Sequence, residues 1–408
     1  MSNQTEQHCN FCGSSRLDVE KLIVGDRSAI CNDCIKLCVS ILAEDGIPTV
    51  KDVSLLNPMF IKEYLDQYVI GQEAAKISLS VAISQHIKRI NNPSKTIELE
   101  KSNVLLLGPS GTGKTMLARK IADYLDLPFA ICDATGITAA GYVGDDVESI
   151  LSRLIASADG DIEQASRGIV YIDEIDKISK KGESASTTRD VGGEAVQQGL
   201  LKMIEGTIMR IPSDAKRKHP SGNMLEIDTT NILFICGGAF VGLDKLIDSR
   251  MNKKSVGCSA SIEASEECDV YSNVTNRDLI AYGLIPEFVG RFSSVVSVKE
   301  LTLPELVEIL HAPKNSLIKQ YQYIFKLDGI NLEFTADALT AIATECQTLK
   351  TNARGLKNIV EKILLPYQYS AQDLFSRGLT KIIINDAAVQ GDPATLVFSK
   401  TQNTASKI

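Results

Sequence analysis

The sequence lacks a long hydrophobic run and lacks the features of a secretory leader. Its longest apolar stretch without a charged residue covers residues 232–243, well short of the roughly 20 residues that a membrane-spanning helix needs. The first ten residues, MSNQTEQHCN, contain neither a basic segment nor an apolar segment. Because a secretory signal requires both, we expect a cytoplasmic protein with no membrane partner.

An excess of positive charge is also missing, because the net charge is −8 at pH 7. A general affinity for nucleic acid is therefore not expected. The 408 residues are 44% hydrophobic and 23% charged, a balance that excludes a wholly disordered chain. This length predicts roughly two to four domains.

Cysteine is unevenly distributed, since half of the ten cysteines precede residue 39. Four of them follow the spacing Cys9-x₂-Cys12-x₁₈-Cys31-x₂-Cys34, which is typical of a four-thiolate zinc site. The sequence thus predicts a structural Zn²⁺ with no open position for water. The alternative is four buried free cysteines, but so small a module could hardly fold without a metal. The net negative charge of residues 1–45 and the apolar Leu37 and Ile41 favour binding to protein, or self-association, over binding to nucleic acid.

A glycine-rich loop, GPSGTGKT at residues 108–115, is the clearest chemical motif. It follows an apolar strand and matches the pattern G-x-x-x-x-G-K-[ST] of phosphate-binding loops. Gly108, Gly111 and Gly113 allow a tight turn whose N–H groups point at phosphate oxygens. Lys114 is expected to reach the β- and γ-phosphates and Thr115 to bind Mg²⁺. The alternative is a chance match in a glycine-rich turn. The apolar strand before the loop argues against that alternative.

A second motif, GIVYIDEID at residues 168–176, ends an apolar strand with carboxylates. We expect Asp173 to hold Mg²⁺ through water and Glu174 to polarise the attacking water. Alone, the pattern could be a plain strand end. Together with the phosphate-binding loop it favours ATP hydrolysis over ATP binding alone.

The intervening pattern predicts an α/β fold with a mostly parallel sheet. Strands are expected at residues 103–108, 168–173 and 231–236, and a helix at 72–91.

From about residue 301 the chain is predicted to be mainly α-helical, with a helix at 352–365 and a last short strand at 380–386. Residues 251–278 are rich in Ser, Asn and Lys and poor in large apolar groups. We expect them to form an exposed loop.

Along the chain, the cysteine module, GPSGTGKT, GYVG, IVYIDEID, ILFICGGAF, GLIPEFVGR and NARGLKN resemble, in order, the motifs of the ClpX family of ATP-driven unfoldases within the AAA+ superfamily. The resemblance covers nearly the whole chain. It implies an AAA+ P-loop domain with a parallel sheet, a small mainly α-helical domain and an N-terminal zinc-binding module. The implied bounds are 1–45 for the zinc module, 46–60 for a linker, 61–300 for the large ATPase domain, 301–400 for the small domain and 401–408 for a tail.

The resemblance also implies roles in nucleotide binding. Val69 and Ile70 correspond to the adenine pocket. Arg291 matches the arginine finger that reaches the nucleotide of a neighbouring subunit, and Arg354 matches sensor 2, which touches the nucleotide of its own subunit. Without the resemblance, both arginines would be interpreted as partners in surface ion pairs. The implied ATP loop consists of Pro109, Ser110, Gly111, Thr112, Gly113, Lys114, Thr115 and Met116.

Three segments resemble the substrate-gripping loops of the family. Tyr142 and Val143 match an aromatic pore loop, although by itself GYVG could be only a structural turn. Residues 186–194 resemble a second pore loop. Arg217, Lys218 and His219 resemble the basic loop at the pore mouth, for which a solvated charge run is the alternative.

The implied machine is a homohexameric ring that uses ATP and Mg²⁺ to unfold polypeptide substrates, with adaptors bound by the Zn²⁺ module and a separate ClpP-type peptidase. No nucleophile with a paired base is evident, so protease activity is not expected. The alternatives are a stand-alone protein remodeller and, less favoured, a nucleic-acid motor.

One departure from the family pattern concerns docking on a peptidase. Family members that dock usually carry Ile-Gly-Phe in a mobile loop, and the nearest counterpart here is Val256-Gly257-Cys258. Losing the aromatic anchor costs several times the ~0.8 kcal/mol of one methylene, and a hexamer repeats the loss at several loops. We therefore expect weak or absent docking on an ordinary ClpP-type peptidase.

Overall fold

A computed structural model of the chain describes residues 8–16, 19–25, 28–44, 57–91, 97, 99–138, 145–180, 193–212, 224–255 and 270–399. Contacts divide the chain into two compact units, Met1–Phe60 and Ile61–Ile408. None of the helices in the described ranges has the length and apolar character that crossing a membrane would require.

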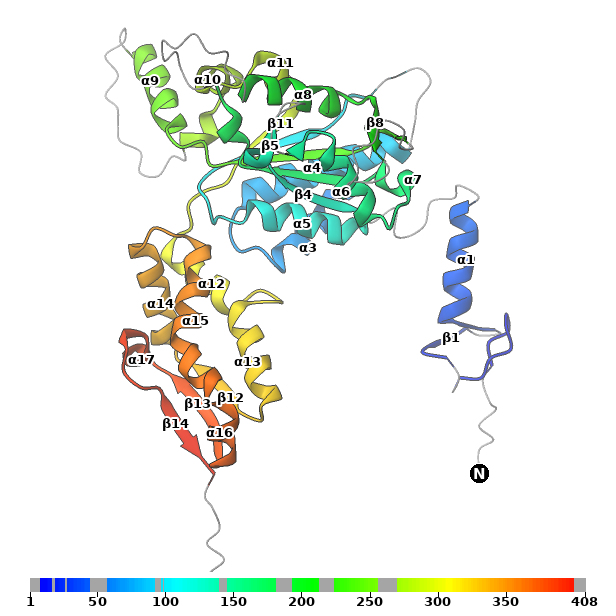
Figure 1. Cartoon of the computed structure of the whole chain (residues 1–408). Helices are drawn as coiled ribbons and strands as arrows, with labels where there is room; N and C mark the ends of the chain where they lie inside the picture. Colours follow the sequence, from blue (N-terminus) through cyan, green and yellow to red (C-terminus); the bar gives the residue numbers. More distant parts are fainter. Residues whose placement is uncertain are drawn as a thin grey trace, which may run out of the picture. The chain divides into compact units, whose positions relative to one another are not determined.

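The first unit is a small hairpin followed by a helix (blue in Figure 1). Strands β1 (Leu22–Val24) and β2 (Ala29–Cys31) pair in antiparallel fashion, and α1 (Asn32–Glu44) begins directly after β2. Its buried centre consists of three cysteines, against which a few partly buried apolar side chains pack. A module with so little apolar core depends on another source of stability.

The second unit contains a five-stranded sheet in the order β11-β3-β10-β7-β4, with every pair parallel. Strands β3 and β10 are buried at every residue, as expected for central strands covered on both faces. The three predicted strands are confirmed as β3, β7 and β10, and so is the predicted parallel α/β fold. The strand bounds are β3 (Asn103–Leu107), β4 (Phe129–Asp133), β7 (Ile169–Asp173), β10 (Leu233–Gly238) and β11 (Phe292–Ser297).

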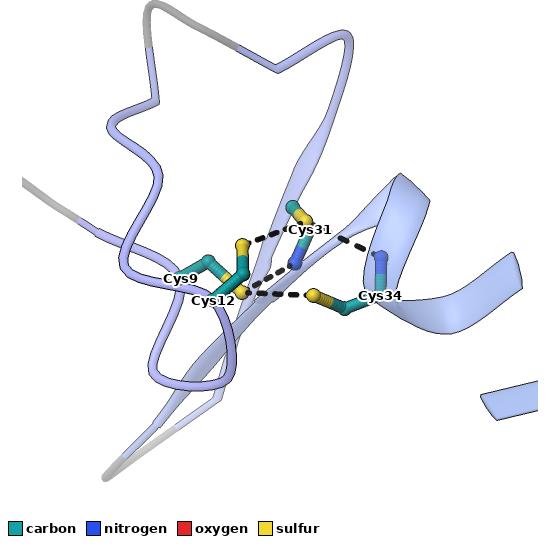
Figure 2. Close-up of side chains that lie close together, drawn as sticks. All are labelled: Cys9, Cys12, Cys31 and Cys34. Carbon is teal, nitrogen blue, oxygen red and sulfur yellow. Dashed lines mark hydrogen bonds between the residues drawn. The ribbon is translucent and has the colours of Figure 1, made fainter. Parts of the chain in front are cut away.

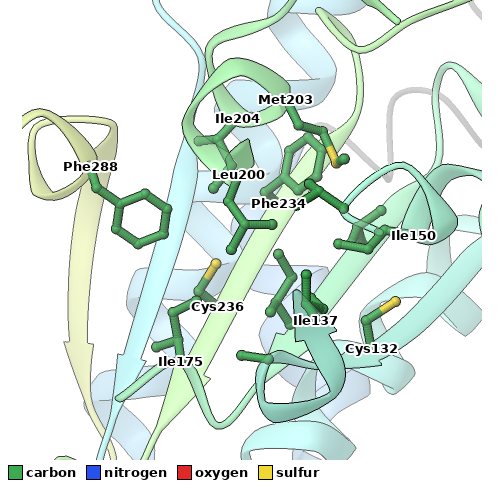
Figure 3. Close-up of a cluster of buried hydrophobic side chains, with 14 of the residues drawn as sticks. Cys132, Ile137, Ile150, Ile175, Leu200, Met203, Ile204, Phe234, Cys236 and Phe288 are labelled. Carbon is green, nitrogen blue, oxygen red and sulfur yellow. The ribbon is translucent and has the colours of Figure 1, made fainter. Parts of the chain in front are cut away.

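Helices cover this sheet, and a hydrophobic core fills the space beneath them. Figure 3 shows Leu200 and Met203 of one such helix, α8, over Phe234 and Cys236 of β10, all of them buried. The helix predicted at 72–91 is confirmed as α4. The helices are α3 (Pro58–Asp66), α4 (Glu73–Asn91), α5 (Lys114–Leu125), α6 (Ser149–Ser157), α7 (Ile162–Ala165), α8 (Gly193–Glu205), α9 (Leu243–Ser255), α10 (Asn276–Tyr282) and α11 (Pro286–Val289).

Short elements complete this part of the chain. The 3₁₀ turns are η1 (Ala134–Gly136), η2 (Ile175–Ile178) and η3 (Val270–Asn273), and the minor strand pairs are β5 (Ile137–Thr138) with β6 (Asp145–Asp146) and β8 (Ile208–Pro212) with β9 (Met224–Asp228).

Residues after 300 form a second hydrophobic core, with more strand than the sequence predicted. The helix predicted at 352–365 is confirmed as α15, which begins one residue later and extends to Tyr369. The strand predicted at 380–386 is confirmed as β13, but it is not the last one, because β14 follows it. β13 is the central strand of a three-stranded sheet, β12-β13-β14. The bounds are α12 (Leu303–His311), α13 (Leu317–Leu327), β12 (Asn331–Phe334), α14 (Ala336–Thr348), α15 (Ala353–Tyr369), α16 (Ala371–Ser376), β13 (Leu379–Ile384), α17 (Asp386–Gln390) and β14 (Thr395–Phe398).

The predicted exposed loop at 251–278 is wrong at both ends. Met251 to Ser255 form the end of α9, while η3 and the start of α10 occupy the other end. Asp278 is buried, and its carboxylate accepts from Arg250 Nε at 2.8 Å and from the Thr275 hydroxyl at 2.7 Å. Polar contacts therefore order a segment that is poor in apolar residues. Residues 256–269 lie outside the described part of the chain.

Candidate nucleotide site and metal centre

The glycine-rich loop connects the carboxyl end of β3 to the start of α5. Since α5 begins at Lys114, its free N–H groups and positive end face the loop, as anion binding requires. Thr112 is buried, and its hydroxyl donates to the Pro109 carbonyl oxygen at 2.8 Å. Met116, in the first turn of α5, is exposed.

Lys114 is folded onto the loop that precedes it. Its ammonium donates to the carbonyl oxygens of Gly108 at 2.6 Å and Pro109 at 2.8 Å. Burial lowers the pKa of Lys114 to about 8, with Asp173 and Asp176 opposing that shift and Arg354 adding to it. A phosphate beside this ammonium would favour the charged form. The lysine is therefore placed where a nucleotide would supply its counter-charge.

The two predicted Mg²⁺ ligands lie in contact. The Thr115 hydroxyl donates to Asp173 Oδ2 at 3.0 Å, although the two residues are 58 positions apart. Tyr171 donates from its hydroxyl to Asp173 Oδ1 at 3.2 Å, and burial raises the pKa of Tyr171, which keeps it a donor. A hydroxyl and a carboxylate are ligands that Mg²⁺ prefers, so the pair fits this ion.

Tyr171 was not predicted as a site residue. It lies two positions before Asp173 on β7, so the alternation of a strand places both side chains on one face, and this was the available signal. A Cβ at Gly237 of the neighbouring β10 would collide with the Tyr171 hydroxyl. The glycine therefore leaves the space that lets the hydroxyl reach the carboxylate.

Glu174 follows Asp173 in a left-handed backbone conformation with φ of 55°. Its N–H donates to Asp173 Oδ1 at 3.0 Å, and its side chain is half-buried. Such a conformation is uncommon for a residue other than glycine and often marks a functional turn. Asp176, a second residue that was not predicted, is buried and accepts from the Ala239 N–H at 3.1 Å. It thereby joins this turn to the segment that follows β10.

The predicted adenine-pocket residues precede α4. Val69 is buried, and its Cγ1 lies 3.8 Å from the position that a Cβ on Gly113 would occupy. Ile70 is half-buried. An apolar wall therefore stands beside the start of α5.

Arg354 lies in the first turn of α15 and is exposed. Its charge acts on Lys114, which places the guanidinium near the glycine-rich loop. The neighbouring Asn352 donates from Nδ2 to the Ser110 carbonyl oxygen at 3.0 Å, a contact that was not predicted. In the sequence, only the motif NARG pointed to a role for this residue.

Arg291 lies at the end of the sheet where its parallel strands begin, opposite the end that carries the glycine-rich loop. It directly precedes β11, whose first residue, Phe292, is paired with Asn103 at the start of β3. The glycine-rich loop follows the opposite end of β3, about 13 Å away for a strand of this length. Arg291 instead pairs with Glu205 Oε1 at 2.5 Å. The arginine is therefore not part of the nucleotide site of its own chain.

The substrate-loop predictions fall on residues that the structure does not describe. Tyr142, Val143, Arg217, Lys218, His219 and Val256-Gly257-Cys258 lie outside the described ranges, as does most of 186–194.

The four predicted zinc ligands do come together, as Figure 2 shows. All four sulfur atoms lie within 4.8 Å of one another. The Cys9 and Cys34 sulfurs are 3.8 Å apart, and the Cys12 and Cys31 sulfurs are 3.7 Å apart. A tetrahedral ion with Zn–S bonds of 2.3 Å separates its ligands by about 3.8 Å. The spacing therefore matches tetrahedral zinc.

Backbone N–H groups support this cluster. The Cys31 N–H donates to Cys9 Sγ at 3.3 Å, and the Cys34 N–H donates to Cys31 Sγ at 3.4 Å. Burial alone would raise the pKa of Cys9, but N–H donors from Cys12, Cys31 and Phe11 lower it to about 6. Metal binding requires thiolates, so these donors favour the form that binds zinc. Four sulfurs leave no open position, and the centre is structural.

Known protein families match the two parts of the chain that contain these sites. The ClpX C4-type zinc finger family matches residues 7–44, and the AAA domain (Cdc48 subfamily) matches residues 99–295. A Treponema denticola protein is 50% identical over 92% of this chain and 92% of its own length. A Borrelia duttonii protein is 47% identical over 95% of this chain and 92% of its own length. Both relatives are named ATP-dependent Clp protease ATP-binding subunit ClpX.

Proposed function

We propose that this chain is a ring-forming protein unfoldase. It belongs to the ClpX family of AAA+ ATPases, and its cofactors are zinc, ATP and Mg²⁺. In this proposal ATP hydrolysis moves polypeptide substrates through a central pore. The large ATPase domain is residues 61–300 and the small domain is 301–400. The observation that carries the proposal is that Arg291 and the glycine-rich loop lie at opposite ends of the neighbouring strands β11 and β3.

The carboxyl end of the parallel strands can bind nucleotide. Lys114 and the loop N–H groups would hold the phosphates, and Thr115 and Asp173 would hold Mg²⁺. Bound there, Mg²⁺ would supply positive charge beside the phosphate oxygens. Glu174 orients and polarises the attacking water as general base. Val69 and Ile70 contact the adenine.

The amino end of the strands supplies Arg291. Because it lies at the amino end of β3 and β11, away from the loop of its own chain, it would act on the nucleotide of a neighbouring subunit. Closing such head-to-tail contacts generates a ring, here a homohexamer. Arg354 on the small domain contacts the nucleotide of its own subunit, so hydrolysis changes the angle between the domains and moves Tyr142, Val143 and the basic loop at 217–219.

The zinc module would recruit adaptors or self-associate. Its side chains include apolar groups that are well exposed, namely Phe11, Ile23, Val24, Leu37 and Ile41. An exposed apolar surface on so small a module is suited to protein contact.

Mixed rings test the shared site. Arg291→Ala removes the group given to the neighbour, and Glu174→Gln removes the water-polarising carboxylate. Each variant should lose ATPase activity alone, and mixing them should restore part of it, because some interfaces then combine an intact Glu174 with an intact Arg291. A mixture that is no more active than the separate variants would argue that Arg291 acts within its own chain.

The relatives named as Clp protease subunits support work with a ClpP-type peptidase, whereas Val256-Gly257-Cys258 favours a stand-alone remodeller. A fluorescent substrate with a degradation tag separates these outcomes. Loss of fluorescence with ATP alone indicates unfolding, and fragments formed only with added peptidase indicate docking. If neither occurs and DNA stimulates the ATPase, the alternative of a nucleic-acid motor replaces the proposal.

A further inference from the structure

The turn between α14 and α15 contacts the glycine-rich loop, although it belongs to the second hydrophobic core. Asn352 Nδ2 donates to the Ser110 carbonyl oxygen at 3.0 Å, and the Ala353 N–H donates to the Gly111 carbonyl oxygen at 3.2 Å. Asn352 is buried. One turn therefore holds two successive carbonyl groups of the loop.

These bonds fix the direction of the loop N–H groups. The Ser110 carbonyl shares a peptide plane with the Gly111 N–H, and the Gly111 carbonyl shares one with the Thr112 N–H. In a trans peptide the two groups point to opposite sides, so carbonyls bonded to the turn leave the N–H groups directed away from it. Phosphates bind to those N–H groups. The contact is thus compatible with nucleotide and prepares the loop for it.

The backbone of Asn352 is strained at the point where its side chain makes this contact. Its φ of 48° and ψ of −153° lie in a region that residues other than glycine rarely adopt. Cys346 Sγ supports the turn by donating to the Asn352 carbonyl oxygen at 2.8 Å. On the loop side, a Cβ at Gly111 would lie 3.0 Å from Asn352 Cβ and from the Thr351 carbonyl oxygen, so the close approach needs glycine there.

We propose that Asn352 is a positioning residue for nucleotide, whose side-chain amide clamps the loop in its phosphate-binding orientation. Glycine would adopt this backbone without strain, so the backbone alone does not account for asparagine. The amide does account for it, because it reaches a loop carbonyl that nothing on a glycine could reach. The inference rests on the ATPase activity and is independent of the unfolding activity proposed above.

Two substitutions in the full-length chain separate the amide from the backbone. Asn352→Gly keeps the turn and removes the donor, whereas Asn352→Asp keeps the size and presents an oxygen to the Ser110 carbonyl. Without the clamp, the loop must order itself on binding. We expect Asn352→Gly to bind a fluorescent ADP analogue about fivefold more weakly, as for one lost hydrogen bond, and Asn352→Asp to bind it at least as weakly.

The kinetic and stability readouts exclude a merely structural role. In Asn352→Gly, KM for ATP should rise about fivefold, kcat should change less than about twofold, and the melting temperature should stay the same or rise. Asn385→Gly is the matched control, because Asn385 caps α17 of the same core through the Ala388 N–H. It should leave nucleotide affinity unchanged.

Wild-type affinity and KM in Asn352→Gly would overturn the inference, because glycine satisfies every requirement of the backbone. Weak nucleotide binding by this variant supports the clamp even if the wild-type ring unfolds no substrate. The two proposals can therefore fail separately.

Discussion

The zinc centre and the nucleotide site differ in how far apart along the chain their parts lie. Cys9 and Cys34 are 25 positions apart, and the ion itself would join them. In the nucleotide site, Thr115 and Asp173 are 58 positions apart, and Asn352 contacts Ser110 across 242 positions. A sheet and a second hydrophobic core must form before those contacts exist. One site is therefore held by its ligand and the other by the fold.

This difference predicts opposite responses to loss of the ligand. The zinc module has almost no apolar core, and zinc sites of this type contribute about 10–16 kcal/mol to folding. The nucleotide site belongs to a unit with two large cores, so its architecture should persist without nucleotide.

The largest expected effect is therefore the loss of one zinc ligand. Cys34→Ser should release zinc and unfold the first unit while ATPase activity stays within about twofold of wild type. Cys38→Ser is the control, because Cys38 follows one turn later on α1 but lies outside the sulfur cluster. Zinc content, limited proteolysis and ATPase rate measure the three effects. Equal zinc loss in both variants, or collapse of the ATPase in Cys34→Ser, would contradict the comparison.

The nucleotide site should instead lose chemistry while its architecture persists. Glu174→Gln removes the carboxylate that polarises water and leaves the Asp173 and Thr115 contact in place. Because a general base contributes about 10²–10⁴-fold, we expect kcat to fall at least 100-fold with little change in ATP affinity or melting temperature. Steady-state kinetics and nucleotide titration measure this. Turnover near the wild-type rate would remove Glu174 from the proposed mechanism.

The same contrast explains what the sequence could predict. The spacing of four cysteines was sufficient for the zinc centre, since all of its ligands are local. The loop motif and the acidic strand end predicted the chemistry of the nucleotide site but not Tyr171, Asp176 or Asn352. Tyr171 shares a strand face with Asp173, Asp176 lies in a buried turn, and Asn352 contacts a distant segment. These relations become visible only once the chain is folded.

The fold itself was predicted where apolar runs are long. Strands β3, β7 and β10 are almost wholly buried, so their composition was a sufficient signal. Strands β12 and β14 have four residues each and are partly exposed, which leaves too short a pattern. The ends of the 251–278 segment are ordered by the Arg250 and Asp278 pair, and hydrophobic periodicity cannot detect such contacts.

Acid should weaken the second unit through His86, a buried histidine that belongs to neither site. Burial, with help from Arg89 and Lys101, lowers the pKa of His86 to about 3, against about 6.5 in an unfolded chain. Between these values the unfolded state binds more protons, so the free energy of unfolding falls as pH falls below 6.5. From pH 7.5 to 5.5 the loss from this group is about 1.4 kcal/mol.

His86→Leu should remove this part of the pH dependence. Urea unfolding of the wild type and of His86→Leu at the two pH values, followed by circular dichroism, measures the change in the free energy of unfolding. Acid affects the zinc centre equally in both proteins, so that effect cancels when they are compared. His311→Gln is the control, because His311 is exposed at the end of α12. An unchanged slope in His86→Leu would show that other groups cause the acid sensitivity.

The smallest expected effect concerns how firmly the fold holds a Mg²⁺ ligand. Tyr171→Phe keeps the buried ring and removes the hydroxyl that donates to Asp173 Oδ1. The carboxylate then loses one of its fixed partners and must be oriented when Mg²⁺ binds. We expect the Mg²⁺ concentration for half-maximal ATPase activity to rise about fivefold, as for one hydrogen bond, while kcat at saturating Mg²⁺ changes less than about twofold. A Mg²⁺ titration of the ATPase rate measures both.

Tyr321→Phe is the matched control for Tyr171→Phe. Tyr321 is also buried and donates to a carboxylate, Glu361 Oε1 at 3.0 Å, but within the second core and away from the nucleotide site. Both substitutions remove one hydroxyl from a core, so both should lower the melting temperature by a similar amount. If the fold positions Asp173 through Tyr171, the Mg²⁺ requirement changes in the first variant alone. An equal change in both variants would mean that general destabilisation, and not the orientation of one carboxylate, sets the affinity for the metal.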